Sequence, residues 1–277
     1  MINNHRVALI PGAGRPVGRA IAHAFGQAGI HLVLPLIDDW PESNTEMVNQ
    51  FTDCGYTFIN PRCDLTKADE VKKLLSLIQA DFGRLDFLVN NIERGGMPIV
   101  HGSYDQQVNK DQWQLEFDTT LKAKWELFQR AKPLILSDGG GSVTNISSIA
   151  GIIGRSGPAS GLFSDGYSCA NRAIKSLTET WARETGPSIR VNEVMIGLVQ
   201  GRHGENTRGW GLLSAAQQED LRNHTLLKRT AHPDEIAEIV YFLAVKATYV
   251  TGCQLVADGG YCLGGETITE LPPGVLS

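Results

Sequence analysis

Several common features are lacking from this chain of 277 residues. The five cysteines are odd in number and scattered, and none forms a CxxC pair or stands near a histidine at zinc-ligand spacing. No apolar run reaches the 18 residues that a transmembrane helix requires. The sequence therefore predicts no disulfide framework, no metal site and no membrane partner.

Excess positive charge is lacking as well. The formal net charge is −5, whereas a protein that binds nucleic acid has to neutralise phosphates with a basic surface. We therefore expect no nucleic-acid partner. The opening residues MINNHRVALI pass directly into an apolar run, without the charged and then apolar pattern of a signal segment. A reducing cytoplasmic location is the expectation.

Short apolar runs alternate with helical periodicity along most of the chain. The expected strands are residues 6–10, 30–36, 56–60, 85–90, 142–146, 189–195 and 254–258. The expected helices are residues 17–28, 68–82, 111–131, 167–185 and 233–246. In the second of these helices, apolar side chains recur at positions i, i+3, i+4 and i+7.

The apolar runs are continuous rather than alternating, which is typical of a parallel sheet covered on both faces. Strands that alternate with helices of this length indicate an α/β fold with a doubly wound sheet and right-handed crossovers. No internal repeat or low-complexity linker divides the chain. The sequence predicts one domain with about seven parallel strands and helices on both faces.

A glycine-rich segment follows the first expected strand. In VALIPGAGRPVGRAIAHAF, Gly12, Gly14 and Gly18 lie between a strand and an amphipathic helix. Such glycines allow a tight turn and the close approach of a pyrophosphate, whose negative charge the helix N-terminus favours. The same pattern is also compatible with a strand–helix turn that binds nothing.

The segment PGAGRPVG resembles the TGxxxGxG loop of the short-chain dehydrogenase/reductase family. Gly12 and Gly18 match that pattern, whereas Pro11 replaces its threonine and Pro16 its middle glycine. Proline is geometrically welcome in the first turn of a helix, but it has no N–H to offer a phosphate. The resemblance implies a single Rossmann-type NAD(P)-binding domain over residues 1–277.

Further segments resemble the same family in the same order. CDLT is similar to its adenine-side segment, LVNNIE to its NNAG motif, VTNISSIAG to its serine strand and VNEVMIGLV to its VNxxxPG segment. The C-terminal region LLKRTAHPDEIAEIVYFLAVKATYVTGCQLVADGG is close to the family form. Ile92 and Glu93 depart from the NNAG pattern. The resemblance implies cofactor-binding roles for Asp64, Asn90 and Gly197.

The resemblance implies NADP or NAD as the cofactor. The family position whose acidic residue selects NAD falls on Leu36, which cannot bond a ribose hydroxyl. Asp38 lies two residues further on and is better explained as an exposed turn residue that helps to start the next helix. Arg15 occupies a place where NADP-preferring members often have a basic residue, and a guanidinium suits a 2′-phosphate. The balance favours NADP.

The family's catalytic residues map onto four positions of this chain. The serine is Ser148 and the tyrosine is Tyr167, whereas Asn171 stands in place of the lysine and Thr120 in place of the asparagine. In the family the lysine lowers the pKa of the tyrosine, because a nearby positive charge favours its ionised form. Asn171 can still bond a ribose hydroxyl, but it carries no charge.

No other cation on the Tyr167 helix is an obvious substitute. Lys175 is eight residues along, which is about 12 Å on a helix, and Arg172 is roughly 140° around it. Both are expected to be surface charges.

Three less regular segments complete the chain. The loop 155–166 lengthens the spacing between the serine and the tyrosine, and we expect it to border the substrate pocket. Residues 201–224 correspond to the family's variable substrate lid, in which Trp210 forms either an apolar wall or part of the core. Residues 265–277 are a tail without periodicity. The resemblance also implies a homo-oligomer, a tetramer or a dimer.

Three functions remain open at this point. The first is an oxidoreductase that transfers hydride between NAD(P)(H) and a carbonyl or secondary alcohol of a small molecule, with Tyr167 as acid/base and Ser148 orienting the substrate. The second is a cofactor-independent lyase resembling halohydrin dehalogenases. The third is a non-catalytic protein that senses a nucleotide. The changes at Pro16 and Asn171 leave the last two open.

Overall fold

A computed structural model describes residues 5–37, 41–92, 110–137, 139–201, 208–211, 213–266 and 274. Asp38 and Glu93 lie outside these residues, as do most of the predicted tail and residues 202–207 and 212 of the predicted lid.

The centre of the fold is one parallel sheet of seven strands in the order β3-β2-β1-β4-β5-β6-β7. Its strands are β1 (Val7–Leu9), β2 (His31–Val33), β3 (Phe58–Ile59), β4 (Phe87–Asn90), β5 (Gly141–Ser148), β6 (Ile189–Ile196) and β7 (Gln254–Ala257). The strand order reverses between β1 and β4, and ligands of open α/β sheets bind outside the carboxyl ends of the strands at such a point. The predicted fold class is confirmed.

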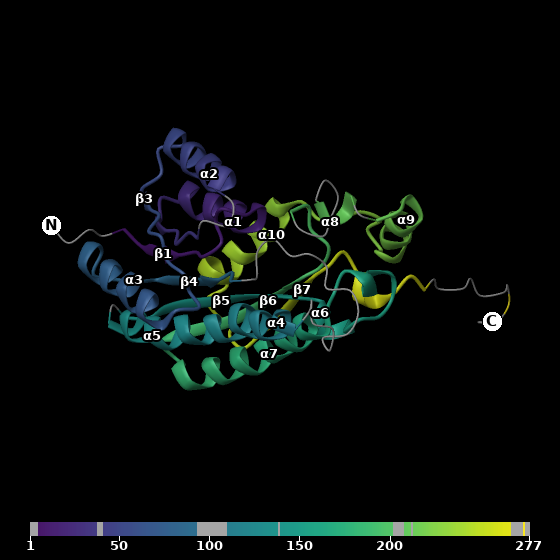
Figure 1. Ribbon diagram of the computed structural model, residues 1–277. Helices are drawn as coiled ribbons and strands as arrows, with labels where there is room; N and C mark the ends of the chain where they lie inside the picture. The colour runs from purple at the N-terminus through teal and green to yellow at the C-terminus, as the bar shows by residue number, and fades with distance from the viewer. Residues whose placement is uncertain are drawn as a thin grey trace.

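Helices cover both faces of the sheet (Figure 1). One face packs on α1 (Pro16–Gln27), α2 (Pro41–Asp53) and α10 (Pro233–Tyr241), and the other on α3 (Ala68–Asp81), α5 (Ala123–Ser137) and α7 (Asp165–Thr185). The shorter helices are α4 (Lys110–Glu116), α6 (Ala150–Ile153), α8 (Arg208–Gly211) and α9 (Ala215–His224). The 3₁₀ segments are η3 (Pro158–Gly161) and η5 (Tyr261–Leu263).

The apolar periodicity accounts for the packing of α3. The apolar side chains that recur along one face of this helix are buried, among them Val71, Leu74 and Ile78. On the same face of the sheet, α5 and α7 are joined by stacked rings of Phe128 and Trp181, whose centroids are 3.9 Å apart. Such a pair contributes about 1 kcal/mol beyond the burial of its area. This contact holds the two helices that border the candidate active site.

Two predicted helices contain a change of winding. The helix expected over residues 111–131 is α4, a π-helix η2 (Phe117–Lys122) and α5 in succession, and it continues to Ser137. The helix expected over 233–246 is α10 followed by a π-helix η4 (Phe242–Lys246). A π turn inserts one extra residue per turn and is frequent at functional sites. Helix α2 was absent from the predicted helices because it buries only Met47 and Phe51.

Candidate active site at the carboxyl ends of the strands

The candidate residues gather where β1, β4, β5 and β6 end, beside a third apolar cluster. That cluster joins the segment after β5 to the lid and the C-terminal region, and its members are Ile149, Ala150, Ala159, Leu162, Phe163, Tyr167, Leu198, Trp210, Leu221 and Tyr261. We call it the apolar roof. Trp210 is thus part of the same cluster as Tyr167, and the hydroxyl of Tyr261 accepts the N–H of Ala159 (2.8 Å) to fix the loop 155–166.

The turn between β1 and α1 is tight. Gly12 has a φ of +74°, and its carbonyl accepts the N–H of Arg15 (3.0 Å). A Cβ placed on Gly18 would lie 2.2 Å from the Gly12 oxygen. The Asn91 amide donates to the Pro11 oxygen (3.2 Å) and ties the end of β4 to this turn. Both family glycines are therefore required by the backbone path itself.

The N-terminus of α1 faces this turn without a side-chain cap. Arg15 is the N-cap residue and makes no capping hydrogen bond from its side chain, while Pro16 is the first helical residue. The first N–H groups of a helix have no acceptor within it, and they attract anions. Pro16 removes one such donor. The remaining turn fits a pyrophosphate group, with one donor fewer than a glycine would give.

Gly14 has a packing role that the sequence did not indicate. Its carbonyl accepts hydrogen bonds from the hydroxyl of Ser43 (2.5 Å) and from Arg19 (3.3 Å). A Cβ on Gly14 would lie 2.0 Å from the Asn44 side-chain oxygen. The start of α2 therefore lies directly on the glycine turn, and a larger residue at position 14 would have to displace the Asn44 side chain.

On the adenine side, Leu36 and Asp64 lie at the ends of β2 and β3. Leu36 forms an isolated parallel bridge with Arg62. The Asp64 carboxylate accepts the N–H and hydroxyl of Thr66 (3.0 and 2.6 Å) and pairs with Lys67 (3.2 Å). Burial alone would raise the pKa of Asp64, but these partners outweigh it and hold the pKa below its ordinary value. Asp64 is therefore ionised and shapes the turn before α3.

Asn90 and Gly197 end β4 and follow β6. The Asn90 amide nitrogen donates to the Lys124 carbonyl (3.1 Å) and to the Asn145 side chain (3.2 Å), and its buried side-chain oxygen has no partner among the described residues. A Cβ on Gly197 would lie 2.7 Å from Cα of Asp258. Close passage of the backbone is thus sufficient reason for this glycine.

Ser148 and Tyr167 lie on adjacent elements. Ser148 is the last residue of β5, and its hydroxyl accepts the N–H of Ala150 (3.1 Å). Tyr167 is in the first turn of α7, where its N–H donates to the capping hydroxyl of Ser164 (3.2 Å) and its ring stacks on Phe163 with centroids 5.9 Å apart. Both side chains are buried, and Tyr167 belongs to the apolar roof.

Asn171 is buried one turn after Tyr167, as the helical spacing predicts. Its amide nitrogen donates to the Tyr167 carbonyl (2.9 Å), so one end of the side chain is held against its own helix. Arg172 and Lys175 are exposed, as expected, and Lys175 pairs with Glu179 (3.8 Å).

Thr120 lies in the π-helix η2 and is fully buried. Its hydroxyl donates to the Glu116 carboxylate (2.5 Å). Lys124, four residues on, is also buried and its ammonium donates to the Ile92 carbonyl. Sequence reasoning missed Glu116 and Lys124. The four-residue spacing of three polar side chains in WQLEFDTTLKAKW was the signal that would have found them.

A buried polar row crosses the sheet beneath α7. Asn90, Asn145, Glu193 and Gln254 lie in register on β4, β5, β6 and β7. The Glu193 carboxylate accepts the Ser147 hydroxyl (2.5 Å) and the Gln254 amide (2.6 Å). Burial raises the pKa of Glu193 even though these two partners oppose the shift.

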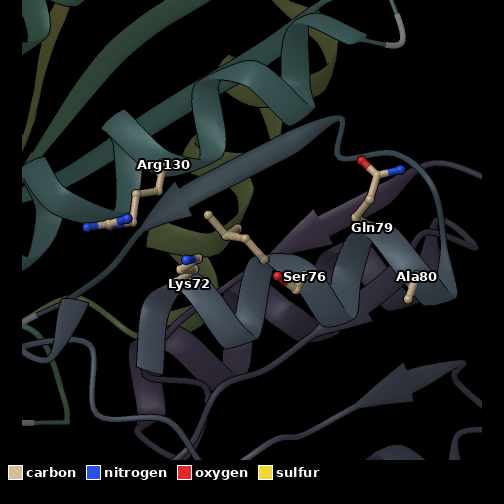
Figure 2. Close-up of a pocket in the computed structure, with 6 residues that line it drawn as sticks. Lys72, Ser76, Gln79, Ala80 and Arg130 are labelled. Carbon is tan, nitrogen blue, oxygen red and sulfur yellow. The ribbon is translucent and has the colours of Figure 1, made fainter. Parts of the chain in front are cut away.

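A separate hollow lies between α3 and α5 (Figure 2). Its lining includes Lys72, Ser76 and Gln79 of α3 and Arg130 of α5, and the last pairs with Glu126 on its own helix. None of the predicted site residues lines it. It is not the candidate active site.

Comparison with known proteins decides the family. The family model described as enoyl-(acyl carrier protein) reductase matches residues 12–262, which is most of the chain. A solved short-chain dehydrogenase/reductase described as glucose/ribitol dehydrogenase, from Brucella melitensis, superposes with a TM-score of 0.76 at 25% identity, over 92% of this chain and 96% of its own. The chain belongs to the short-chain dehydrogenase/reductase family. It is an NAD(P)-dependent oxidoreductase by class.

Curated relatives of this short-chain dehydrogenase/reductase agree with that class. The 3-oxoacyl-(acyl-carrier-protein) reductase FabG of Thermotoga maritima is 27% identical over 92% of this chain and 97% of its own length. The protein of the same name from Staphylococcus epidermidis is 28% identical over 92% and 98%. These relatives favour the oxidoreductase over the cofactor-independent lyase and the nucleotide sensor. In the described part of the chain, no helix combines the length and apolarity needed to cross a bilayer.

Proposed function

We propose that this protein reduces a carbonyl group of a small molecule to a secondary alcohol with NADPH, and that Tyr167 donates the proton. Bound NADPH supplies the hydride to the carbonyl carbon. The Tyr167 hydroxyl gives its proton to the carbonyl oxygen, and the Ser148 hydroxyl donates a hydrogen bond that orients that oxygen. The observation that carries this proposal is the burial of Ser148 and Tyr167 on adjacent elements, at the carboxyl edge of the sheet where the glycine turn after β1 also lies.

Two features support NADPH over NADH. Leu36 follows β2 and has an apolar side chain, so no carboxylate at this position accepts hydrogen bonds from the two ribose hydroxyls or repels a 2′-phosphate. Arg15 lies at the N-terminus of α1, where its guanidinium suits that phosphate. In this proposal Gly12 and Gly18 shape the pyrophosphate turn, and Asp64 and Gly197 border the adenine and nicotinamide ends.

A 3-oxoacyl thioester is the substrate class to test first. The relatives named above are 3-oxoacyl reductases. Phe163, Leu198 and Trp210 belong to the same buried cluster as Tyr167, and apolar surroundings of this kind suit an acyl chain. The lid segment 201–224 contributes Trp210 and Leu221 to this cluster, which supports its assignment as the substrate cover.

We also propose that the protein is a cytoplasmic homo-oligomer assembled through α4 and α5. Trp113, Leu115 and Trp125 on these helices are large apolar side chains that are each about 40% exposed or more. An exposed group of this kind marks an interaction surface. Light scattering coupled to size-exclusion chromatography would give the number of chains, and a monomer at micromolar concentration would contradict this part of the proposal.

The decisive experiment is a pair of titrations followed by an assay. NADPH and NADH are added to the purified protein, and tryptophan and nucleotide fluorescence report the Kd of each. We expect micromolar binding of NADPH and at least tenfold weaker binding of NADH. Reduction of a 3-oxoacyl thioester is then followed by loss of NADPH absorbance.

Tyr167→Phe is the matched variant, because it removes only the hydroxyl. We expect kcat to fall by about 10²- to 10⁴-fold with the NADPH Kd unchanged. An active wild type whose turnover survives this change would rule out Tyr167 as the acid. Binding without turnover on a panel of carbonyl compounds would favour a nucleotide sensor.

A further inference from the structure

Lys124 is a buried lysine at the start of α5, four residues after Thr120. Only 2% of its surface is exposed. Transfer of an ammonium group from water into a protein interior costs several kcal/mol unless the group is paired or has a partner to bind. Its apolar neighbours on the same segment, Leu127 and Phe128, belong to the core. Lys124 thus brings a charged group into the interior about one helical turn from a candidate catalytic position.

The contacts of Lys124 place its ammonium at the end of β4. That group donates to the carbonyl of Ile92, and the carbonyl of Lys124 accepts the amide of Asn90 (3.1 Å). The intervening residue, Asn91, donates to Pro11 in the glycine turn (3.2 Å). Lys124 is therefore tied on both sides to the end of β4, which contacts the phosphate turn through Asn91.

The direction of the side chain is also favourable. Helical side chains lean toward the N-terminus of their helix, so Lys124 reaches over the turn that contains Thr120. The π-helix η2 at that turn packs on α7, which carries Tyr167 and Asn171. At the end of β4, the Asn90 amide nitrogen donates to the Lys124 carbonyl (3.1 Å), and the buried Asn90 side-chain oxygen has no partner among the described residues.

We propose that Lys124 supplies the positive charge that Asn171 lacks, so that the cation of this active site lies on α5 instead of α7. Its ammonium donates to the ribose hydroxyls at the nicotinamide end of the cofactor, and its charge favours the ionised form of Tyr167. This inference rests on the proposed function.

Lys124→Met tests the proposal, because methionine keeps the apolar stem and removes the charge. Lys122→Met is the matched control, since Lys122 is 70% exposed two residues away and pairs with Asp118. We expect Lys124→Met to weaken NADPH binding at least tenfold, as loss of a hydrogen bond from a charged group does. The apparent pKa of the basic group in the pH profile of alcohol oxidation should rise by at least one unit. Lys122→Met should change neither quantity.

Ultraviolet titration of tyrosine ionisation in the cofactor-free protein gives a readout that does not depend on turnover. The Tyr167 contribution is isolated by subtracting the titration of Tyr167→Phe. We expect that contribution to move to higher pH in Lys124→Met and to stay in place in Lys122→Met. A purely structural role of Lys124 would lower the melting temperature and leave this titration unchanged, which would overturn the proposal.

Asn171→Lys separates the outcomes if Lys124→Met does not fold. If Lys124 already supplies the charge, a second lysine in the wild-type background should change kcat and the NADPH Kd less than threefold. Where Lys124→Met does fold, Asn171→Lys should restore both quantities in that background. A gain of tenfold or more in the wild-type background would overturn the proposal. Loss of turnover in Tyr167→Phe but not in Lys124→Met would reject Lys124 alone, whereas failure of the wild type to bind NADPH would reject both.

Discussion

The two ends of the cofactor cleft differ in how their residues are specified. At the phosphate end, Gly18 is required because an added carbon would lie 2.2 Å from the Gly12 backbone oxygen, and Gly12 by its positive φ, whereas an added carbon at Gly14 would meet the Asn44 side chain at 2.0 Å. At the nicotinamide end, side chains have the proposed catalytic roles, and there Thr120 and Asn171 replace two members of the family's catalytic set.

This difference shows which contacts with a cofactor can be supplied from elsewhere in the fold and which cannot. A backbone turn fits its anion only along one path, so its glycines cannot move elsewhere. A positive charge acts through space and can be delivered from a neighbouring helix when the distance permits. In the proposal above, the buried Lys124 on α5 and the uncharged Asn171 on α7 are such a pair, on two helices that pack together.

Ser148→Ala should have the largest effect and should be confined to the nicotinamide end. Loss of the hydroxyl removes one hydrogen bond to the reacting oxygen, and we expect kcat to fall by about 10²-fold with the NADPH Kd unchanged. Steady-state kinetics and fluorescence titration measure the two quantities. Ser156→Ala, an exposed serine that donates to Ile153, serves as the control. Equal losses of kcat and cofactor affinity in Ser148→Ala would break the comparison.

Gly18→Ala should act at the phosphate end. The added carbon would lie 2.2 Å from the Gly12 oxygen, so the turn has to open. We expect a loss of about 1–3 kcal/mol in the free energy of unfolding and at least tenfold weaker NADPH binding. Chemical denaturation and fluorescence titration measure these changes. Gly161→Ala, where an added carbon meets nothing within 4 Å, should be close to neutral.

Glu193→Gln tests whether the buried carboxyl group in the polar row under α7 makes the free energy of unfolding depend on pH. Burial raises the pKa of Glu193, so the folded protein holds this proton more tightly than the unfolded chain. The stabilisation is complete below the ordinary pKa of glutamate and is lost as pH rises through the raised value. Glutamine mimics the protonated form, and the Gln254 amide can turn to complement it.

We therefore expect Glu193→Gln to melt at a higher temperature than the wild type at pH 8 and at a similar temperature at pH 4. Thermal unfolding monitored by circular dichroism across this range measures the difference. A variant that is less stable than the wild type at every pH would contradict a raised pKa.

Pro16→Gly should have the smallest effect and the opposite sign on affinity. Glycine restores one N–H at the start of α1, which we expect to strengthen NADPH binding by about twofold to tenfold. The melting temperature should fall slightly, because proline is favourable at the first helical position and glycine is not. Unchanged affinity would show that this donor does not face the phosphates.

Local signals in the sequence accounted for the sheet, for most helices and for the positions of Ser148 and Tyr167. The π-helix around Thr120 was not predictable, because a change of winding depends on what packs against the helix rather than on its residues alone. The contact between Gly14 and the start of α2 was not predicted for a similar reason. Ser43 and Asn44 belong to a helix that buries few apolar residues, so the sequence did not indicate this helix.

The sequence by itself determined the succession of strands and helices along the chain, the glycine turn at the end of β1 and the loss of charge at Asn171. These features depend on residue type and spacing within about twenty residues of chain. Only the tertiary structure decided that Lys124 is buried, because its partners Asn90 and Ile92 are 34 and 32 residues away in the chain. It likewise decided that Glu193 is enclosed by Ser147 and Gln254 from neighbouring strands. Burial and the environment of a charge are properties of the packed chain, and they emerge when distant segments exclude water together.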